Sequence, residues 1–339
     1  MKRFHWSCAF ACLPFIFSLA SPYRTGAAES AKNRPKLLVA FSSMGAAYAP
    51  LWIAKERGFF DGHGINAELV LLRGGVLAIQ ALVGAEVSFI YAGGAPAVDA
   101  ALGGADVVML ANPITDAGQS LVTRKEIKSL KELKGKTIAV NSLAGPAIIL
   151  LNTVVESVGL VPGKDVRYLL IGDPPARLLA LRSGNVDATA LNPPYTLHAR
   201  RAGYNLFDHT NIPVLKTFQL PIASVIARRS YVRAEPLVAE NFVKSIIEGI
   251  HFYKTNKSGT IAVLRQHLKL SDPEELEETY LRYLNGFVAK PYPTAESVRP
   301  LLAASRRPEA KTAAPVQFVD PQIVEKLDAQ GFIDSLYRK

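Results

Sequence analysis

Short apolar segments alternate with amphipathic segments along the first two thirds of the chain, and the same alternation occurs twice. Apolar runs bounded by glycine, serine or proline predict strands, and apolar residues three and four apart predict helices. The first unit reads as strand, helix, strand, helix and strand at 36–43, 44–60, 65–72, 76–84 and 87–94. The second has the same order at 136–142, 144–159, 165–172, 173–184 and 186–194.

This repeated order predicts the fold class, two α/β lobes joined by a two-stranded hinge. Apolar strands that alternate with helices are typical of buried parallel sheets covered on both faces. We expect lobe II to comprise residues 118–222, and lobe I to comprise 29–117 together with a mostly helical second part, 223–339. The extended stretches 105–124 and 217–232 would then cross between the lobes and let them move without unfolding.

Each predicted strand ends in small, polar or turn-forming residues. The six ends read FSSMG, LLRGG, IYAGG, VNSLAG, IGDPP and LNPP. They are compatible with ordinary turns, but ligands of open α/β sheets bind outside the carboxyl ends of the strands. Six similar ends in two facing lobes therefore predict a ligand held between the lobes.

The first residues form a separate segment. Lys2 and Arg3 precede an apolar run at 10–20, and small residues follow at 26–28, which is the layout of a secretory signal peptide. We expect residues 1–28 to be removed after export, so that the protein works in the periplasm. A cytosolic or disordered N-terminus is the alternative.

Both cysteines of the chain, Cys8 and Cys12, lie in this segment. The rest of the chain therefore has no side chain for a disulfide, a thiol nucleophile or a thiolate metal site. The net charge is +10, yet basic residues occur only as scattered pairs, so we expect no nucleic-acid partner. We expect no metal and no cofactor.

Several longer segments carry a family resemblance. They read PLWIAKERGFFDGHGINAELV, IKSLKELKGKTIAVNS, PPARLLALRSGNVDATALNPP, IIEGIHFYKTN and DPEELEETYLRYL. With them the chain resembles the solute-binding proteins of nitrate/sulfonate/taurine-type ABC importers, the SsuA/THI5-like or NMT1-like group. The resemblance implies a type II periplasmic binding protein, a monomer without enzyme activity. It would close on a small anionic or zwitterionic solute and dock transiently on an ABC permease in the inner membrane.

The resemblance also implies where the solute binds, namely on the loops that follow the strands. Lobe I would contribute Ser42, Ser43, Met44, Tyr48, Arg73, Gly74, Tyr91, Gly93, Gly94, Asn112 and Thr115. Lobe II would contribute Asn141, Ser142, Gly145, Asp173, Asn192 and Tyr195.

The residue types at these positions suggest chemistry, each with a plainer alternative. Ser43 and Ser142 precede helix starts, where backbone N–H groups favour an anion, but both could simply cap a helix. The guanidinium of Arg73 could bind a carboxylate or sulfonate through two N–H groups, or it could lie in solvent. Asp173 before two prolines is typical of an N-cap, but its carboxylate could instead bind an amine of the solute.

Three other functions stay open. The chain could bind a thiamine-pyrimidine precursor, or it could be the related pyrimidine synthase, although its lack of cysteine after the export segment argues against that enzyme. It could also be an exported sensor that presents its ligand to a membrane receptor. The sequence contains no G-x-S-x-G, P-loop or H-E-x-x-H motif.

Overall fold

The computed structural model describes residues 36–116, 118–141, 143, 146–208, 210–216 and 219–338. The predicted signal peptide, with Cys8 and Cys12, lies outside the described residues, and so do the candidate site residues Ser142 and Gly145.

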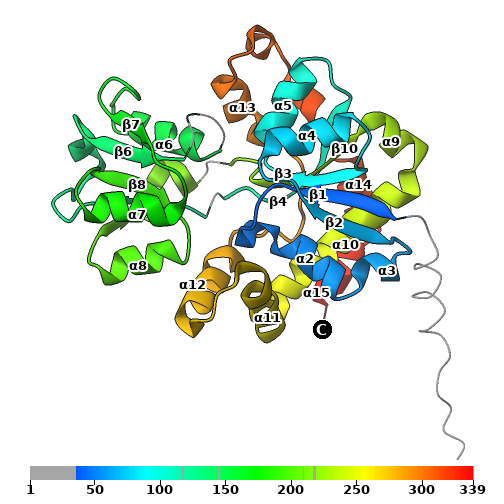
Figure 1. Cartoon of the computed structure of the whole chain (residues 1–339). Coiled ribbons are helices and arrows are strands. Elements are labelled where there is room, and N and C mark those ends of the chain that lie inside the picture. The colour runs from blue at the N-terminus through cyan, green and yellow to red at the C-terminus, as the bar shows by residue number, and fades with distance from the viewer. Residues whose placement is uncertain are drawn as a thin grey trace, which may run out of the picture.

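The first sheet belongs to lobe I and has the strand order β2-β1-β3-β10-β4 (Figure 1). Its strands are β1 (Leu37–Phe41), β2 (Ala67–Leu71), β3 (Phe89–Ala92), β4 (Val107–Ile114) and β10 (Ala223–Arg228). β1 pairs in parallel with β2 and with β3. β10 is antiparallel to both β3 and β4, so the returning chain fills the position between them.

The second sheet belongs to lobe II and has the corresponding order β7-β6-β8-β5-β9. Its strands are β5 (Ser120–Thr123), β6 (Thr137–Val140), β7 (Arg167–Leu170), β8 (Ala188–Leu191) and β9 (Asn205–Phe207). β6 pairs in parallel with β7 and β8, whereas β5 is antiparallel to β8 and β9. The two-fold β-α-β-α-β order expected from the hydrophobic pattern is thus present in both sheets.

Alternate residues of the strands enter separate cores, because successive side chains point to opposite faces of a sheet. In β1 and β3, Val39, Phe41, Phe89 and Tyr91 face one core, whereas Ala40, Ile90 and Ala92 face the other. In β6, Ile138 and Val140 face one core of lobe II and Ala139 faces the second. Both sheets are therefore buried on both sides.

Helices cover all four faces. Lobe I carries η1 (Ala46–Tyr48), α2 (Ala49–Glu56), α3 (Phe59–Gly62), α4 (Gly75–Val83), α5 (Gly94–Leu102), α9 (Arg229–Ala234), α10 (Pro236–Thr255), α11 (Lys257–Leu268), α12 (Pro273–Leu284), α13 (Ala295–Ala304), η4 (Pro308–Lys311), η5 (Pro315–Phe318), α14 (Gln322–Ala329) and α15 (Phe332–Tyr337). Lobe II carries η2 (Leu130–Leu133), α6 (Pro146–Glu156), α7 (Pro174–Arg182), α8 (Tyr195–Arg201) and η3 (Pro213–Lys216). In Figure 1, α4 and α5 lie on one side of the first sheet, and α2, α3 and α10 on the other.

The crossings between the lobes explain how the sheets face each other. The chain leaves the carboxyl end of β4 and enters β5 at Ser120, which pairs with Leu191 at the carboxyl end of β8. It returns from the carboxyl end of β9 to Ala223 of β10, which pairs with Ile114. The two crossing segments are hydrogen-bonded to each other, since Leu220 N donates to Thr115 O at 3.0 Å. The carboxyl ends of both sets of parallel strands are therefore directed toward the other lobe.

The structure also departs from the expected elements. The helix expected at 44–60 ends at Glu56, because Gly58 has φ of +72° and starts the separate helix α3. Helices α5, α8 and α13 were not expected from the sequence pattern. The domain boundaries at 117 and 222 stay predictions. Within the described part of the chain, no helix combines the length and apolarity that a membrane span requires.

Candidate functional site

Three aromatic and hydroxyl side chains meet at the carboxyl ends of β1 and β3. Ser42 Oγ and the hydroxyl of Tyr48 are hydrogen-bonded at 2.7 Å, and the rings of Tyr48 and Tyr91 meet edge to face with centroids 5.6 Å apart. Burial raises the pKa of Tyr48 to about 12, and the bond to Ser42 offsets part of that effect. Burial also raises the pKa of Tyr91, so both hydroxyls are protonated at neutral pH, and that of Tyr91 has no hydrogen-bond partner among the described residues.

The other candidates after the strands of lobe I differ in exposure. Ser43 is exposed, and Met44 packs against the lobe I core. Arg73 is exposed and forms no hydrogen bond or ion pair with other described residues. Gly74 N donates to Ser42 O at 3.1 Å, which ties the loop after β2 to the loop after β1. Gly93 immediately precedes α5 at its N-cap position.

Asn112, Tyr91 and Gly94 are buried in lobe I, as Tyr48 is, and their contact with a solute stays a prediction. Both ends of the Asn112 amide are used inside lobe I, because it donates to Ser297 Oγ at 3.2 Å and accepts from Ser224 Oγ at 2.6 Å. Gly94 packs so closely against the second crossing that a Cβ there would lie 2.8 Å from Pro221 Cβ. The backbone carbonyl of Thr115 accepts the hydrogen bond that joins the two crossings.

In lobe II, the end of β6 and the start of α7 provide the polar groups. Asn141 is exposed at the end of β6. Asp173 is the N-cap of α7 and accepts a hydrogen bond from Ala176 N at 3.4 Å, as its position before two prolines predicted. Asp173 therefore has the structural role that the sequence allowed, and it is also exposed.

Arg177 is a buried charged residue near the strand ends that the sequence analysis did not select. It lies on the first turn of α7 and is only 5% exposed. Its Nη1 donates to Gly172 O at 2.5 Å and its Nη2 to Ala190 O at 3.3 Å, so the guanidinium bridges the carboxyl ends of β7 and β8. Burial lowers the pKa of Arg177, although the negative charge of Asp173 partly opposes this. In the sequence, Arg177 is one of two arginines in the amphipathic segment that forms α7, and nothing in that pattern indicated that its guanidinium would be buried between two strands.

Tyr283 is a second residue that the sequence analysis missed, and it joins the two lobes. It belongs to α12 of lobe I, is 4% exposed, and accepts a hydrogen bond from Asn192 Nδ2 of lobe II at 3.2 Å. Its ring also lies against Gly118 on the first crossing. Burial raises the pKa of Tyr283, so its hydroxyl is protonated at neutral pH. Tyr195, another candidate, is partly buried at the start of α8.

The first crossing is also held by an ion pair. Arg282 donates from Nη1 and Nη2 to the two oxygens of Asp116, at 2.8 and 2.9 Å. Asp116 accepts from Gly118 N as well, at 2.9 Å. A bidentate pair of this kind fixes orientation, so helix α12 of lobe I holds the segment that enters lobe II.

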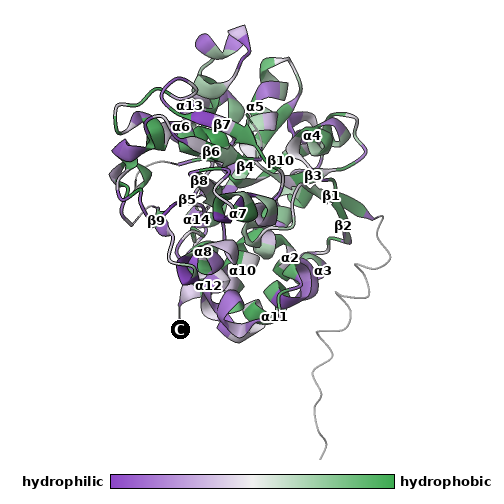
Figure 2. Cartoon of the chain, turned by 60° about the vertical axis from the view of Figure 1, so that its left-hand side comes forward, coloured by the Kyte–Doolittle hydropathy of each residue, from purple (hydrophilic) through white to green (hydrophobic). Residues whose placement is uncertain are grey.

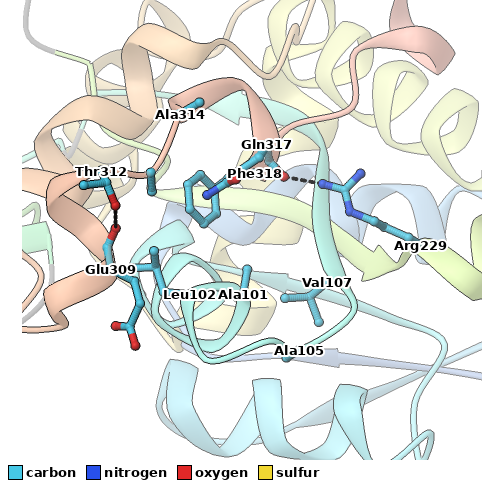
Figure 3. A pocket seen from close by; sticks show the side chains of 11 residues that line it. Ala101, Leu102, Ala105, Val107, Arg229, Glu309, Thr312, Ala314, Gln317 and Phe318 are labelled. Atoms are coloured by element: carbon cyan, nitrogen blue, oxygen red, sulfur yellow. Dashed lines mark hydrogen bonds between the residues drawn. The ribbon is translucent and has the colours of Figure 1, made fainter.

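A hollow of about 530 Å³ lies elsewhere, between α5 and the short helices η4 and η5 (Figure 3). Val107 and Arg229 line it, and Arg229 donates to Gln317 O. Val107 begins β4, so this hollow lies at the end of the sheet opposite to the strand ends described above. Among the described residues, no group of three or more His, Cys, Asp or Glu side chains could hold a metal ion.

Comparisons with known proteins identify the family and the fold. The NMT1-like family matches residues 30–268. The chain belongs to the NMT1-like family. Within the curated proteins, YtlA of Bacillus subtilis, which carries the name of a binding protein, is 22% identical over 295 residues, covering 84% of this chain and 85% of YtlA.

Solved structures show the fold of this NMT1-like protein. The periplasmic aliphatic sulphonate binding protein SsuA of Escherichia coli has a TM-score of 0.66 at 20% identity, covering 84% of this chain and 89% of SsuA. The periplasmic nitrate-binding protein NrtA of Synechocystis PCC 6803 has a TM-score of 0.63 at 14% identity, covering 87% and 88%. The desulfurization enzyme DSZB has a TM-score of 0.58 at 16% identity, covering 88% and 99%. The fold is therefore that of periplasmic binding proteins, as expected.

Proposed function

We propose that this NMT1-like protein is an exported solute-binding protein that captures a small anionic or zwitterionic organic solute between its lobes and delivers it to an ABC importer. One observation carries the proposal: the carboxyl ends of both parallel strand sets are directed toward the opposite lobe, and Asn192 and Tyr283 join the lobes there. The binding-protein names of YtlA, SsuA and NrtA support it.

In this proposal, binding and closure are one coupled step. The solute first contacts the loops of one lobe, and the two crossings then let the second lobe complete its hydrogen bonds. A ligand shifts the population toward the closed state only if it interacts better with that state. The hydroxyls of Ser42 and Tyr48, the amide of Asn192 and the hydroxyl of Tyr283 are the uncharged groups that would contact the solute.

The exposed cationic side chain of Arg73 is one reason for proposing an anionic solute. Arg73 is exposed beside the loop after β1, and Ser43 precedes the short helix η1. Arg73→Ala is expected to weaken binding of an anionic solute without changing the melting temperature of the ligand-free protein, because an exposed side chain without partners contributes little stability. Unchanged affinity in this variant would remove Arg73 from the site.

The first experiment is a thermal-shift screen of the exported protein against sulfonates, nitrate, amino acids, aromatic acids and thiamine precursors. A solute that binds only the folded state raises its stability by RT ln(1 + [L]/Kd), about 2.7 kcal/mol at a hundred times Kd. One saturable hit among the anions or zwitterions is expected. A hit restricted to thiamine precursors would instead favour the pyrimidine-precursor alternative, and stabilisation by none of the compounds would contradict the proposed solute class.

An enzyme is the second candidate, favoured by the structural similarity to DSZB. Against it, the only cysteines of the chain lie in the predicted export segment, so a thiol nucleophile would be missing after export. Turnover of a bound solute, measured by chromatography of the ligand after incubation, would support the enzyme. Transport of the solute by cells, lost on deletion of the permease, would separate the importer from a sensor.

A further inference from the structure

The buried guanidinium of Arg177 is not ion-paired with a described carboxylate; the exposed Asp173, at the N-cap of the same helix, is the negative charge that acts on it. No described carboxylate forms an ion pair with it, and its two hydrogen bonds go to neutral carbonyls. Burying a charged group that is not ion-paired is costly, and an apolar side chain of similar length would fill such a position at lower cost. The charge at this place therefore calls for an explanation beyond packing.

Its surroundings give that explanation. Together with Asn141 and Gln119, Arg177 lines a narrow gap at the carboxyl ends of β6 and β8, which is too small to hold a water molecule in this arrangement and would have to widen to admit a solute group. The Oε1 atom of Gln119 is buried there and has no donor among the described residues. A fixed cation and an unused acceptor thus line the same gap where the second sheet faces lobe I. Together they would suit an anionic group that carries a hydrogen-bond donor nearby.

We propose that Arg177 and Gln119 form the lobe II half of the solute site, with the guanidinium neutralising the solute's anionic group. This inference rests on the proposed function and deepens it, because it assigns the decisive cation to lobe II, whereas the sequence suggested Arg73 of lobe I. Closure would bring the anion, held first by lobe I, against a charge that the fold already holds in place.

The test compares Arg177→Met with Arg182→Met, a matched loss of charge at an exposed position on the same helix. Ethanesulfonate, acetate and nitrate are the probes, and acetamide is the uncharged control. We expect Arg177→Met to lower anion affinity at least tenfold, Arg182→Met to leave it within about twofold, and acetamide to be insensitive to both.

Arg177→Lys keeps the test decisive if Arg177→Met fails to fold, because lysine keeps the charge but loses the forked donor geometry. It is expected to retain anion binding with affinity reduced about three- to tenfold. Folded Arg177→Met with unchanged anion affinity would overturn the assignment and leave the proposed function standing. Failure of every anion to stabilise the wild type would overturn both.

A separate observation concerns the flank of the molecule where α8 of lobe II meets α12 of lobe I. Basic and polar side chains of α8 face acidic side chains at the start of α12 across the two lobes. Thr196 Oγ1 donates to Glu278 Oε1 at 2.8 Å, and Arg200 Nη1 donates to Glu278 Oε2 at 3.1 Å. Figure 2 shows hydrophilic residues gathered where these helices meet.

Two further contacts extend this row. His198 Nε2 and Glu275 Oε1 are hydrogen-bonded at 2.6 Å. Arg201 donates to Glu274 and lies 3.8 Å from Asp272. Only side-chain ends bridge the two helices in these contacts, so rotation about the crossings would break them together. We call this set of eight residues, Thr196, His198, Arg200, Arg201, Asp272, Glu274, Glu275 and Glu278, the charge latch.

We infer that the charge latch sets how often the lobes close without a solute. Each exposed ion pair contributes little by itself, but several that form and break together shift the open–closed equilibrium measurably. The acidic residues of α12 repel one another when the lobes separate, which adds to the bias toward closure. The solute's apparent affinity then depends on the closed population that the latch maintains.

Glu277 provides a matched control, since it lies on the same helix but pairs with Lys257 inside lobe I at 2.6 Å. Spin labels at Val83→Cys on α4 and Leu179→Cys on α7 report the separation of the lobes, in a chain whose Cys8 and Cys12 are changed to serine. Both labelled positions are exposed. No solute is needed, so the outcome is independent of the proposed function.

We expect Glu275→Gln with Glu278→Gln to lower the closed-to-open ratio three- to tenfold, and Glu277→Gln to leave it unchanged. Raising the salt from about 0.02 M to about 1 M should lower the ratio in the wild type and much less in the double variant. Arg201→Glu should open the lobes, and adding Glu274→Arg should close them again. If the double variant Glu275→Gln with Glu278→Gln shows the same label distances as the control Glu277→Gln, the proposed role of the charge latch is wrong.

Discussion

Polar side chains near the strand ends differ in the partners to which they are hydrogen-bonded. Ser42 and Tyr48 present hydroxyls next to each other, whereas Asn112 satisfies both ends of its amide inside lobe I. All three are polar residues close to a strand end in the sequence. Their different partners follow from neighbours that only the folded chain brings near.

Tyr48→Phe tests the burial of the Tyr48 hydroxyl through the pH dependence of stability. Burial raises the pKa of Tyr48 from 10.0 to about 12, so the folded state holds its proton more tightly than the unfolded state. The stabilisation is fully present below pH 10 and is lost as the pH rises toward 12. The wild type should therefore lose stability more steeply than Tyr48→Phe over this range, by up to about 2.7 kcal/mol.

Denaturant unfolding at several alkaline pH values measures this difference. At neutral pH, loss of the hydrogen bond should cost the variant about 1 kcal/mol. Parallel stability curves for the two proteins between pH 10 and pH 12 would show that the hydroxyl titrates as if it were in water.

At the level of elements, helices that touch the other lobe were the hardest to predict. Helix α8 has seven residues and follows two prolines, and the sequence pattern there indicated only the end of a strand. Helix α6 was predicted, but not that it contacts α13 of lobe I. Neighbouring isoleucines of α6 show the consequence, because Ile148 packs in a core of lobe II and Ile149 in a core of lobe I.

Ile149→Ala and Ile148→Ala should therefore have different effects. Ile148→Ala removes core packing and should lower the free energy of unfolding by about 2–5 kcal/mol. Ile149→Ala removes a contact that exists only while the lobes are together, so it should lower the melting temperature less and the closed-to-open ratio more. Spin-label distances and thermal unfolding measure the two quantities, and equal effects on both would contradict the assignment of Ile149 to the interlobe contact.

At the scale of the whole molecule, motion depends on two short crossings. Gly118 on the first crossing has φ of +64°, and a Cβ there would lie 2.8 Å from the ring of Tyr283. Arg282 holds the neighbouring Asp116. The crossing is thus tied to α12, the same helix that carries the acidic half of the charge latch.

Gly118→Ala is expected to destabilise the protein by about 1–3 kcal/mol and to shift the open–closed equilibrium, because the methyl group displaces Tyr283. Gly104→Ala is the control, since Gly104 also has a positive φ, +87°, but has open space around it. It should cost about 1 kcal/mol and leave lobe separation unchanged. Unfolding curves and label distances that match in the two variants would show that Tyr283 moves freely.

The sequence by itself determined the two α/β units, their strand order along the chain, the crossings and the family resemblance, because hydrophobic periodicity and turn residues act over a few neighbours. It also placed Asp173 correctly as an N-cap. Tertiary structure decided which lobe carries the buried cation, Arg177, that Tyr283 meets Asn192, and that α8 meets α12. These are pairings between residues about 80 or more positions apart, or burial created by distant strands, and no local pattern encodes them.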